Sequence, residues 1–159
     1  MKTAIIYTTK YGSTAHLAGL LSNACQGEPR LFDLAKEKPS LAEYDTVLLG
    51  GPIYAGRIPK GLSRFCKENE DALAAKNLGL FLCGMGTEED AKKSLEASFS
   101  QKLLSAAKAT GYLGGAYDFK KMNPAERFIV AKISGTKESS SKTLEQNILD
   151  FANVMTGQN

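Results

Sequence analysis

The sequence predicts an α/β domain in which a parallel β-sheet carries helices on both faces. Short apolar segments alternate with helix-like segments through five expected strands, and this alternation is typical of parallel strands joined by helical crossovers. Glycine-containing turns follow three of the apolar segments. Because 43% of the 159 residues are hydrophobic, the chain is long and apolar enough for one well-packed core. We therefore expect a single domain over residues 1–159.

The five expected strands differ in the strength of their signal. The first and third are aliphatic runs suited to burial on both faces, the second has only a short apolar centre, and the fifth is rich in glycine. In chain order, these strands are expected at residues 3–8, 29–34, 45–51, 77–83 and 111–117.

Between the strands, apolar residues at three- and four-residue spacing predict amphipathic helices. One is expected over residues 14–25, and another opens at Pro59, whose fixed φ suits a first helical turn. Thr87 is expected to cap a helix that continues to Leu103, with acidic residues in its first turn. The last helix is expected to begin at a capping box formed by Thr143 and Gln146.

The composition argues against several classes of function. A net charge of +3 with scattered lysines does not indicate a nucleic-acid-binding protein. Cys25, Cys66 and Cys83 are widely spaced and odd in number, which argues against paired disulfides or a zinc site. A Ser-His-Asp triad would have to use the single histidine, His16. We expect a cytoplasmic protein, since the sequence shows neither a signal-peptide pattern nor a spanning apolar run.

The loop after the first strand has the composition of a phosphate-binding site. It offers hydroxyl groups and a glycine immediately before a predicted helix, whose positive end favours an anion. An ordinary strand–helix turn with a hydroxyl cap is the alternative interpretation. The loop consists of Thr9, Lys10, Tyr11, Gly12, Ser13 and Thr14. Lys10 is interpreted either as a solvated side chain or as a charge that neutralises the phosphate.

Two further loops lie where the third and fourth strands end, and in such sheets ligands bind beyond the carboxyl ends of the strands. The third-strand loop contains Pro52, Ile53, Tyr54, Ala55 and Gly56, and the fourth-strand loop contains Cys83, Gly84, Met85 and Gly86. Their backbone groups form walls for a planar ring, which Tyr54 and Met85 would flank. Alternatively, Tyr54 packs on the domain, Met85 fills a gap and Cys83 is a buried structural thiol.

The spacing of the first loop excludes two common nucleotide signatures. It is neither G-x-x-x-x-G-K-[ST] nor G-x-G-x-x-G, so ATP and NAD lack their usual sequence support. A phosphate loop combined with two backbone-rich walls is instead suited to a mononucleotide with a planar head.

The segment from Thr9 to Thr14 resembles the [ST]-x-x-G-x-T phosphate loop of flavodoxins, which bind flavin mononucleotide (FMN). The two later glycine loops fit the same family. The resemblance implies a flavodoxin-like three-layer fold with strand order 2-1-3-4-5 and an FMN site formed by the three loops. Unlike the acidic electron-transfer flavodoxins, this chain is slightly basic and lacks tryptophan.

A closer resemblance is to the flavodoxin-like, menaquinone-dependent protoporphyrinogen oxidases. Gly115 to Phe119 is similar to their fifth strand, and Glu126 to Gly135 to the basic, apolar helix that follows. Packing on the sheet is one interpretation of residues 120–134. The alternative is contact with a membrane surface, a quinone or an acidic redox partner, because basic residues flank an apolar stripe there.

The favoured functional hypothesis is electron transfer through non-covalently bound FMN, with a redox partner protein or a quinone as partner. The first alternative is an FMN-dependent oxidoreductase of the protoporphyrinogen oxidase or quinone reductase type. The second is a flavin-free binding domain that retains the fold. No side chain is singled out as a catalytic acid, base or nucleophile, and no metal site is expected.

Overall fold

A computed structural model describes residues 2–10, 12–84, 86–117, 124 and 140–157 of the chain. Its centre is a five-stranded, all-parallel sheet with the order β2-β1-β3-β4-β5, which confirms the predicted topology. The strands are β1 (Thr3–Tyr7), β2 (Arg30–Asp33), β3 (Thr46–Pro52), β4 (Asn77–Cys83) and β5 (Ala107–Tyr112).

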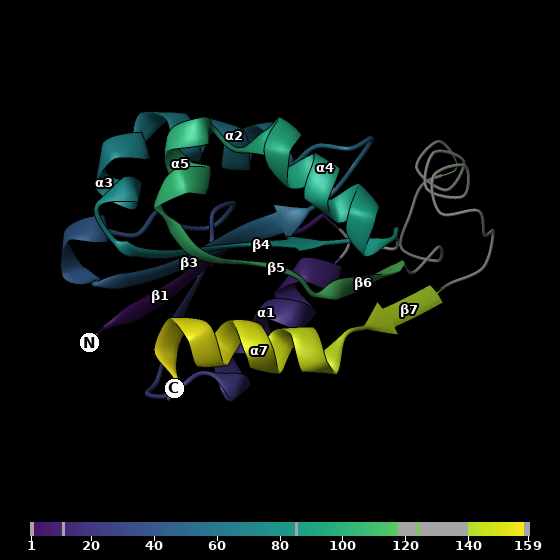
Figure 1. The fold of residues 1–159 in the computed structure, drawn as a ribbon, viewed down its shortest axis with the longest axis horizontal. Coiled ribbons are helices and arrows are strands. Elements are labelled where there is room, and N and C mark those ends of the chain that lie inside the picture. Colours follow the sequence, from purple (N-terminus) through teal and green to yellow (C-terminus); the bar gives the residue numbers. More distant parts are fainter. Residues whose placement is uncertain (1, 11, 85, 118–123, 125–139, 158–159) are drawn as a thin grey trace.

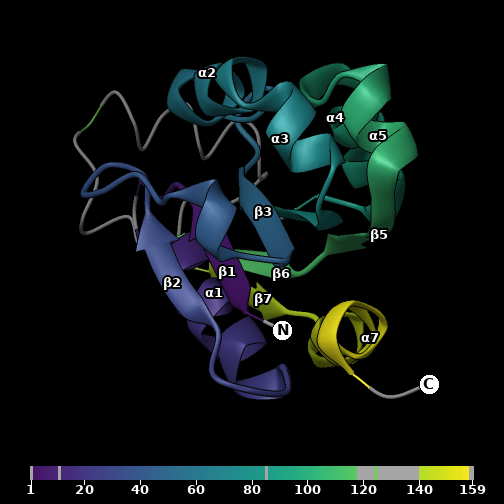
Figure 2. The same ribbon diagram turned by 90° about the vertical axis from the view of Figure 1, so that its left-hand side faces the viewer.

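Helices cover both faces of this sheet (Figures 1 and 2). One layer contains α1 (Ser13–Ala24) and α7 (Glu145–Thr156). The other layer contains α2 (Lys60–Glu68), α3 (Glu70–Ala74), α4 (Glu88–Ser98) and α5 (Gln101–Ala106). A 3₁₀ turn, η1 (Leu41–Glu43), precedes β3, where the sequence predicts a loop or a short helical turn.

The sheet separates two hydrophobic clusters, and the strands are apolar on both faces for this reason. Consecutive strand residues point to opposite faces, so Ile5 packs with α1 and α7 residues while Ile6 joins the cluster that includes α2 and α5 residues. In the first cluster, the rings of Phe81 and Phe151 meet edge to face at 6.0 Å. These central strands therefore read as continuous apolar runs rather than as alternating ones.

The predicted long helix after Thr87 is divided in two. Thr87 caps α4 as expected, since its side chain accepts a hydrogen bond from the Asp90 backbone and the Asp90 carboxylate accepts one from the Thr87 N–H. The helix then ends at Ser98, and Ser100 caps α5 by accepting from the Leu103 N–H at 3.2 Å. Phe99 and Leu103 are both buried. The apolar residues therefore keep their four-residue spacing although the helix is interrupted before Ser100.

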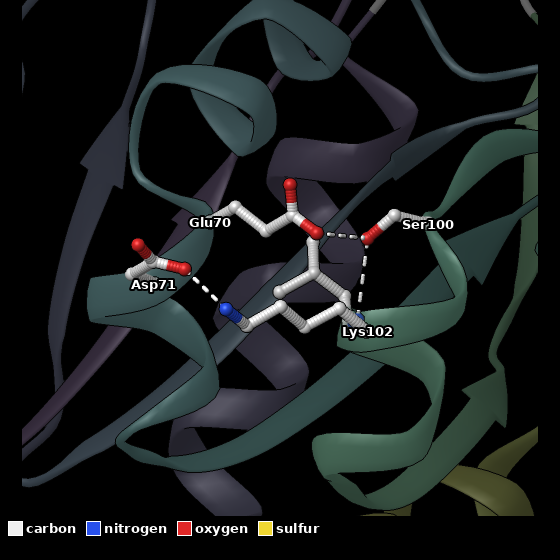
Figure 3. A network of polar contacts seen from close by, with 5 residues as sticks. Glu70, Asp71, Ser100 and Lys102 are labelled. Carbon is white, nitrogen blue, oxygen red and sulfur yellow. Dashed lines mark hydrogen bonds and ion pairs between the residues drawn. The ribbon is translucent and has the colours of Figure 1, made fainter.

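The same serine also ties α5 to α3 (Figure 3). The Ser100 hydroxyl donates to the Glu70 carboxylate at 3.0 Å, and Lys102 forms an ion pair with Asp71. Helices α3 and α5 thus lie side by side, and their exposed polar groups pair across the junction.

Two sequence predictions near the C-terminal part were wrong. The fifth strand is Ala107–Tyr112 rather than residues 111–117, because β6 (Gly114–Tyr117) leaves the sheet and pairs antiparallel with β7 (Ser140–Thr143). Thr143 is consequently a strand residue, and α7 begins at Glu145 without a side-chain cap among the described residues. The short separate ladder of β6 and β7 accounts for both differences.

Candidate functional site

The carboxyl ends of β1, β3 and β4 lie at one edge of the sheet, as the predicted site requires. Tyr7 pairs with Gly50, and Pro52 pairs with Cys83, so the loops that follow these strands leave the sheet as neighbours. The site is therefore built from segments that are far apart in the chain and adjacent in space.

The loop between β1 and α1 turns sharply at Gly12. This glycine has a φ of 85° and forms the N-cap position of α1, and its N–H donates to the Thr9 hydroxyl at 3.1 Å. No described side chain caps α1, and the N–H groups at the start of a helix have no acceptor within the helix. Glycine is favoured at this position because the left-handed conformation is strained for other residues.

Thr14 supplies an unusual polar group at the start of α1. Its side chain is 1% exposed, yet its hydroxyl oxygen has no hydrogen-bond partner in the described part of the chain. A buried hydroxyl without a partner is unfavourable by about 1–3 kcal/mol. Such a group at the positive end of a twelve-residue helix is the feature expected where an anionic ligand completes the hydrogen bonding.

A second buried hydroxyl without a partner among the described residues belongs to Thr8, at the end of β1. A side chain at Gly51 would collide with this hydroxyl, at 2.8 Å, and with Leu62, at 2.9 Å. Glycine at position 51 therefore lets β3 pass close to the start of the first loop. Thr8 was missed by the sequence interpretation, which placed it inside the strand.

The loop after β3 forms a tight hairpin beside the first loop. Tyr54 and Arg57 exchange backbone hydrogen bonds of 2.8 and 3.1 Å, with Ala55 (φ 49°) and Gly56 (φ 80°) as the two central residues. Positive φ at both centres is typical of a type I′ turn. The Lys10 ammonium lies 5.7 Å from the centre of the Tyr54 ring. This cation–π contact joins the loop after β1 to the loop after β3.

The loop after β4 is fixed by bonds within the protein. The Tyr112 hydroxyl lies 2.6 Å from the Gly84 carbonyl oxygen and 2.7 Å from that of Gly86, so its single proton is shared between them. The Gly84 N–H donates to the Gly114 carbonyl at 2.8 Å. Sequence reasoning did not identify Tyr112, although an aromatic residue with a polar tip near the end of a buried strand usually has a hydrogen-bond partner.

Cys83 is a buried structural thiol, which confirms the conservative interpretation. Its side chain is 1% exposed, and burial raises the pKa of the thiol to about 12. The Thr14 hydroxyl lies close enough to the sulfur to oppose this shift in part, but the pair does not reach hydrogen-bond geometry. Because the thiolate is the reactive form, this cysteine is inert near neutral pH. It packs in the hydrophobic cluster that contains α1 residues such as Leu17.

Six predicted site residues line one narrow cleft, together with Gly115 from β6. They are Ser13, Pro52, Ile53, Tyr54, Cys83 and Gly84. Three others, Ala55, Gly56 and Gly86, line a neighbouring cavity of about 490 Å³ against α4. Thr9, Lys10, Gly12 and Thr14 belong to the first loop and the start of α1 without lining either space, and Tyr11 and Met85 lie outside the described residues.

The geometry at this edge fits the phosphate of a mononucleotide. The unpartnered Thr14 hydroxyl, the uncapped start of α1 and the open space around Gly12, where an added Cβ would meet nothing within 4 Å, together form a cradle for an anion. The loops after β3 and β4 border the rest of the narrow cleft, whose volume is about 10 Å³. No cluster of three or more metal-ligating side chains occurs in the described residues.

The chain belongs to the flavodoxin domain family, whose pattern matches residues 4–143. No match was found among curated proteins. None of the described helices is both long and apolar enough to cross a bilayer.

Known structures share the fold at low sequence identity. The Trp repressor binding protein from Bacillus subtilis is 12% identical, with a TM-score of 0.58 over 97% of this chain and 99% of that one. Oxidised flavodoxin 1 from Bacillus cereus is 12% identical, with a TM-score of 0.51 over 85% and 95%. The flavodiiron core of Flv1 from Synechocystis is 14% identical, with a TM-score of 0.51; 96% of this chain aligns, but it spans only 35% of that protein.

Proposed function

We propose that the protein binds FMN non-covalently and transfers electrons through it, as a cytoplasmic carrier. Membership of the flavodoxin domain family supports a flavin-dependent redox function in general terms. The observation that carries the proposal is the buried Thr14 hydroxyl, which lacks a partner at the uncapped start of α1. An FMN phosphate would supply the missing acceptor and would gain from the positive helix end.

In this proposal, each loop has a separate task. Thr14, Ser13 and the N–H groups around Gly12 bind the phosphate, while Thr9 holds the turn at Gly12. The walls of the cleft at Ile53 and Gly84 orient the ring and exclude water. The bound flavin supplies the electron-carrying group, and the protein supplies binding, orientation and electrostatics.

Lys10 and Tyr54 form the exposed margin of the proposed site. Their cation–π contact places a positive charge beside the aromatic face that was predicted to stack on the flavin. Lys10 has two alternative roles, a solvated lysine or a charge that neutralises the phosphate. The position of its ammonium group when FMN is bound, on the Tyr54 ring or at the phosphate, distinguishes them.

Titration of the flavin-free protein with FMN and with riboflavin tests the proposal. Riboflavin carries the same ring but lacks the phosphate, so it serves as a matched control. We expect FMN to bind at least about tenfold more tightly, since charge-assisted hydrogen bonds typically contribute about 1.5–3 kcal/mol. Flavin fluorescence and the absorption spectrum report binding. A protein that takes up neither flavin is a flavin-free domain, and equal affinities would place the phosphate outside the α1 cradle.

A second candidate is an FMN-dependent oxidoreductase of the protoporphyrinogen oxidase or quinone reductase type. The 490 Å³ cavity favours it, because Ile53 and Gly84 line both this cavity and the narrow cleft, and a substrate there would lie beside the proposed flavin. Turnover of protoporphyrinogen or of a quinone above the background of free FMN would establish this activity. A carrier should instead reduce only a partner protein. The predicted partner surface at residues 120–134 lies outside the described residues, apart from Pro124.

A further inference from the structure

The cavity against α4 has features that the electron-transfer proposal does not use. It lies between the Tyr54–Arg57 hairpin, the Gly84–Gly86 turn and one side of α4, and its volume is about 490 Å³. Cavities of about 300–1,000 Å³ are typical of small-molecule sites. None of its lining residues belongs to the first loop or to α1, so it lies outside the phosphate cradle, although it shares Ile53 and Gly84 with the narrow cleft.

Small residues shape the walls of this cavity. Gly56 and Gly84 contribute only backbone, and Ala91 and Ala97 present single methyl groups from α4. The Tyr112 hydroxyl holds the Gly84–Gly86 turn in place, so this wall is fixed before any ligand arrives. Together with the larger side chains of Ile53 and Tyr112, these small residues leave a space of a size suited to an aromatic ring.

Charge at the cavity favours an anion. Arg57 and Lys93 both line it, and neither forms an ion pair with any residue that the structure describes. The third charged group, Asp90, is already engaged: its carboxylate accepts the Thr87 N–H in the capping box and faces the positive end of α4. The buried Ser94 adds a hydroxyl to the same wall. Two cations without a described ion pair and one capping-box carboxylate therefore line the cavity.

We propose that this cavity binds a small aromatic carboxylate, with the ring between the small-residue walls and the carboxylate on Arg57 and Lys93. Arginine and lysine are the side chains suited to this contact, and arginine forms a bidentate pair with a carboxylate. The proposal goes beyond electron transfer: Arg57 and Lys93, which would bind the carboxylate, lie outside the phosphate cradle, whereas Ile53 and Gly84 also line the cleft proposed for FMN.

Equilibrium binding of 2-naphthoate to the flavin-free protein tests the proposal, with the uncharged 2-naphthamide as the matched ligand. The chain contains no tryptophan, so naphthyl fluorescence is read without protein emission at the same excitation. We expect naphthoate to bind more tightly than naphthamide. Lys93→Gln and Arg57→Gln should each weaken naphthoate by about fivefold and leave naphthamide unchanged.

Matched controls exist on the same elements. Lys92 neighbours Lys93 but lines the groove beside β5 instead, and Arg64 lies on α2 outside the cavity. Lys92→Gln and Arg64→Gln should therefore leave naphthoate affinity unchanged. Ala97→Phe should abolish binding by filling the cavity from an exposed position, whereas Glu96→Phe, one residue earlier on α4, should not.

Three outcomes would overturn the proposal: equal affinities for naphthoate and naphthamide, equal losses in Lys92→Gln and Lys93→Gln, or unaltered binding in Ala97→Phe. Competition is equally informative. If FMN displaces naphthoate competitively, the cavity belongs to the flavin site and the separate site is rejected. If FMN fails to bind while naphthoate binds as described, the electron-transfer proposal falls and the carboxylate site stands.

Discussion

The start of α1 and the turn after β4 lie at the same edge of the sheet, but they differ in whether their polar groups are hydrogen-bonded within the protein. At the start of α1, the Thr14 hydroxyl is buried without a described partner and the helix has no described side-chain cap. At Gly84–Gly86, the carbonyl groups share the Tyr112 hydroxyl, and the Gly84 N–H is bonded to Gly114. In our proposal a ligand completes the first region, whereas the second is completed by the protein.

This difference distinguishes two roles in a binding site, which are to hold its shape and to bind the ligand. Groups already bonded within the protein hold the shape of the walls, and their loss should reduce folding stability. Buried groups left without a partner should instead affect ligand binding, because folding alone gains nothing from them. Mutations in the two regions should thus move different observables.

The largest effect is expected at Gly50, which belongs to the framework. A side chain there would overlap the Phe81 carbonyl oxygen and ring on the neighbouring strand, so Gly50→Ala should lower the free energy of unfolding by about 3 kcal/mol. Urea denaturation measures this value. Gly61→Ala is the control, since an added Cβ in α2 meets nothing within 4 Å and should stabilise by about 0.5–1 kcal/mol. A stable Gly50→Ala protein would show that β3 and β4 separate easily.

Thr14→Val should lower FMN affinity rather than folding stability. Because a buried hydroxyl without a described partner is unfavourable, replacing it with a methyl group should leave the free energy of unfolding unchanged or raise it by up to about 1–3 kcal/mol, while FMN affinity falls by about 2 kcal/mol, or about thirtyfold. Fluorescence titration and urea denaturation on the same preparation give both numbers. Thr110→Val on β5 is the control, because this residue lies outside the cradle. A loss of stability without a loss of affinity in Thr14→Val would make Thr14 a framework residue.

Tyr112→Phe should lower folding stability more than FMN affinity, as expected for a residue that holds the shape of the site. The substitution removes the hydroxyl that fixes Gly84 and Gly86, and the free energy of unfolding should fall by about 1.5 kcal/mol. FMN affinity, corrected for the unfolded fraction, should change less than in Thr14→Val. If affinity falls more than stability, the turn after β4 contacts the ligand more directly than its internal bonds suggest.

The smallest effect concerns the buried thiols, which fold as neutral groups. Burial raises the pKa of Cys66 and of Cys83 from 9.0 to about 12. Above pH 9 the unfolded chain loses protons that the folded chain retains, so stability is full below pH 9 and declines toward pH 12. Each thiol should account for a loss of about 1 kcal/mol at pH 10. Urea denaturation at pH 8 and pH 10 should show a smaller decline in Cys66→Ala; an equal decline would mean that Cys66 ionises normally.

The strand order came from the resemblance to flavodoxins, whereas the burial of the strands was predictable because a parallel sheet covered on both faces requires apolar residues at every position of its central strands. Cys83 was placed correctly for the same reason. The break between α4 and α5 was not found, since apolar spacing continued through Phe99 and Leu103 while the cap at Ser100 depends on local geometry. The pairing of β6 with β7 joins segments more than twenty residues apart, which periodicity does not encode.

At the site, sequence indicated which loops meet but not how their groups are used. Hydroxyls and glycines marked the first loop, yet the lack of a partner for Thr14 and for Thr8 emerged only from packing. Tyr112 and the cavity beside α4 were missed, because both depend on β5 and α4 approaching the turn after β4. Arg57 was not singled out from the sequence, although it lines that cavity.

The hairpin at Tyr54–Arg57 has a consequence for the entropy of binding. Two backbone hydrogen bonds and two residues with positive φ hold this loop in one conformation, so its ordering takes place during folding and is not repeated when a ligand arrives. Fixing one residue's backbone opposes binding by about 1–2 kcal/mol. A small molecule at this edge therefore meets a wall whose conformational freedom has already been removed, and its affinity reflects contact and charge more than loop closure.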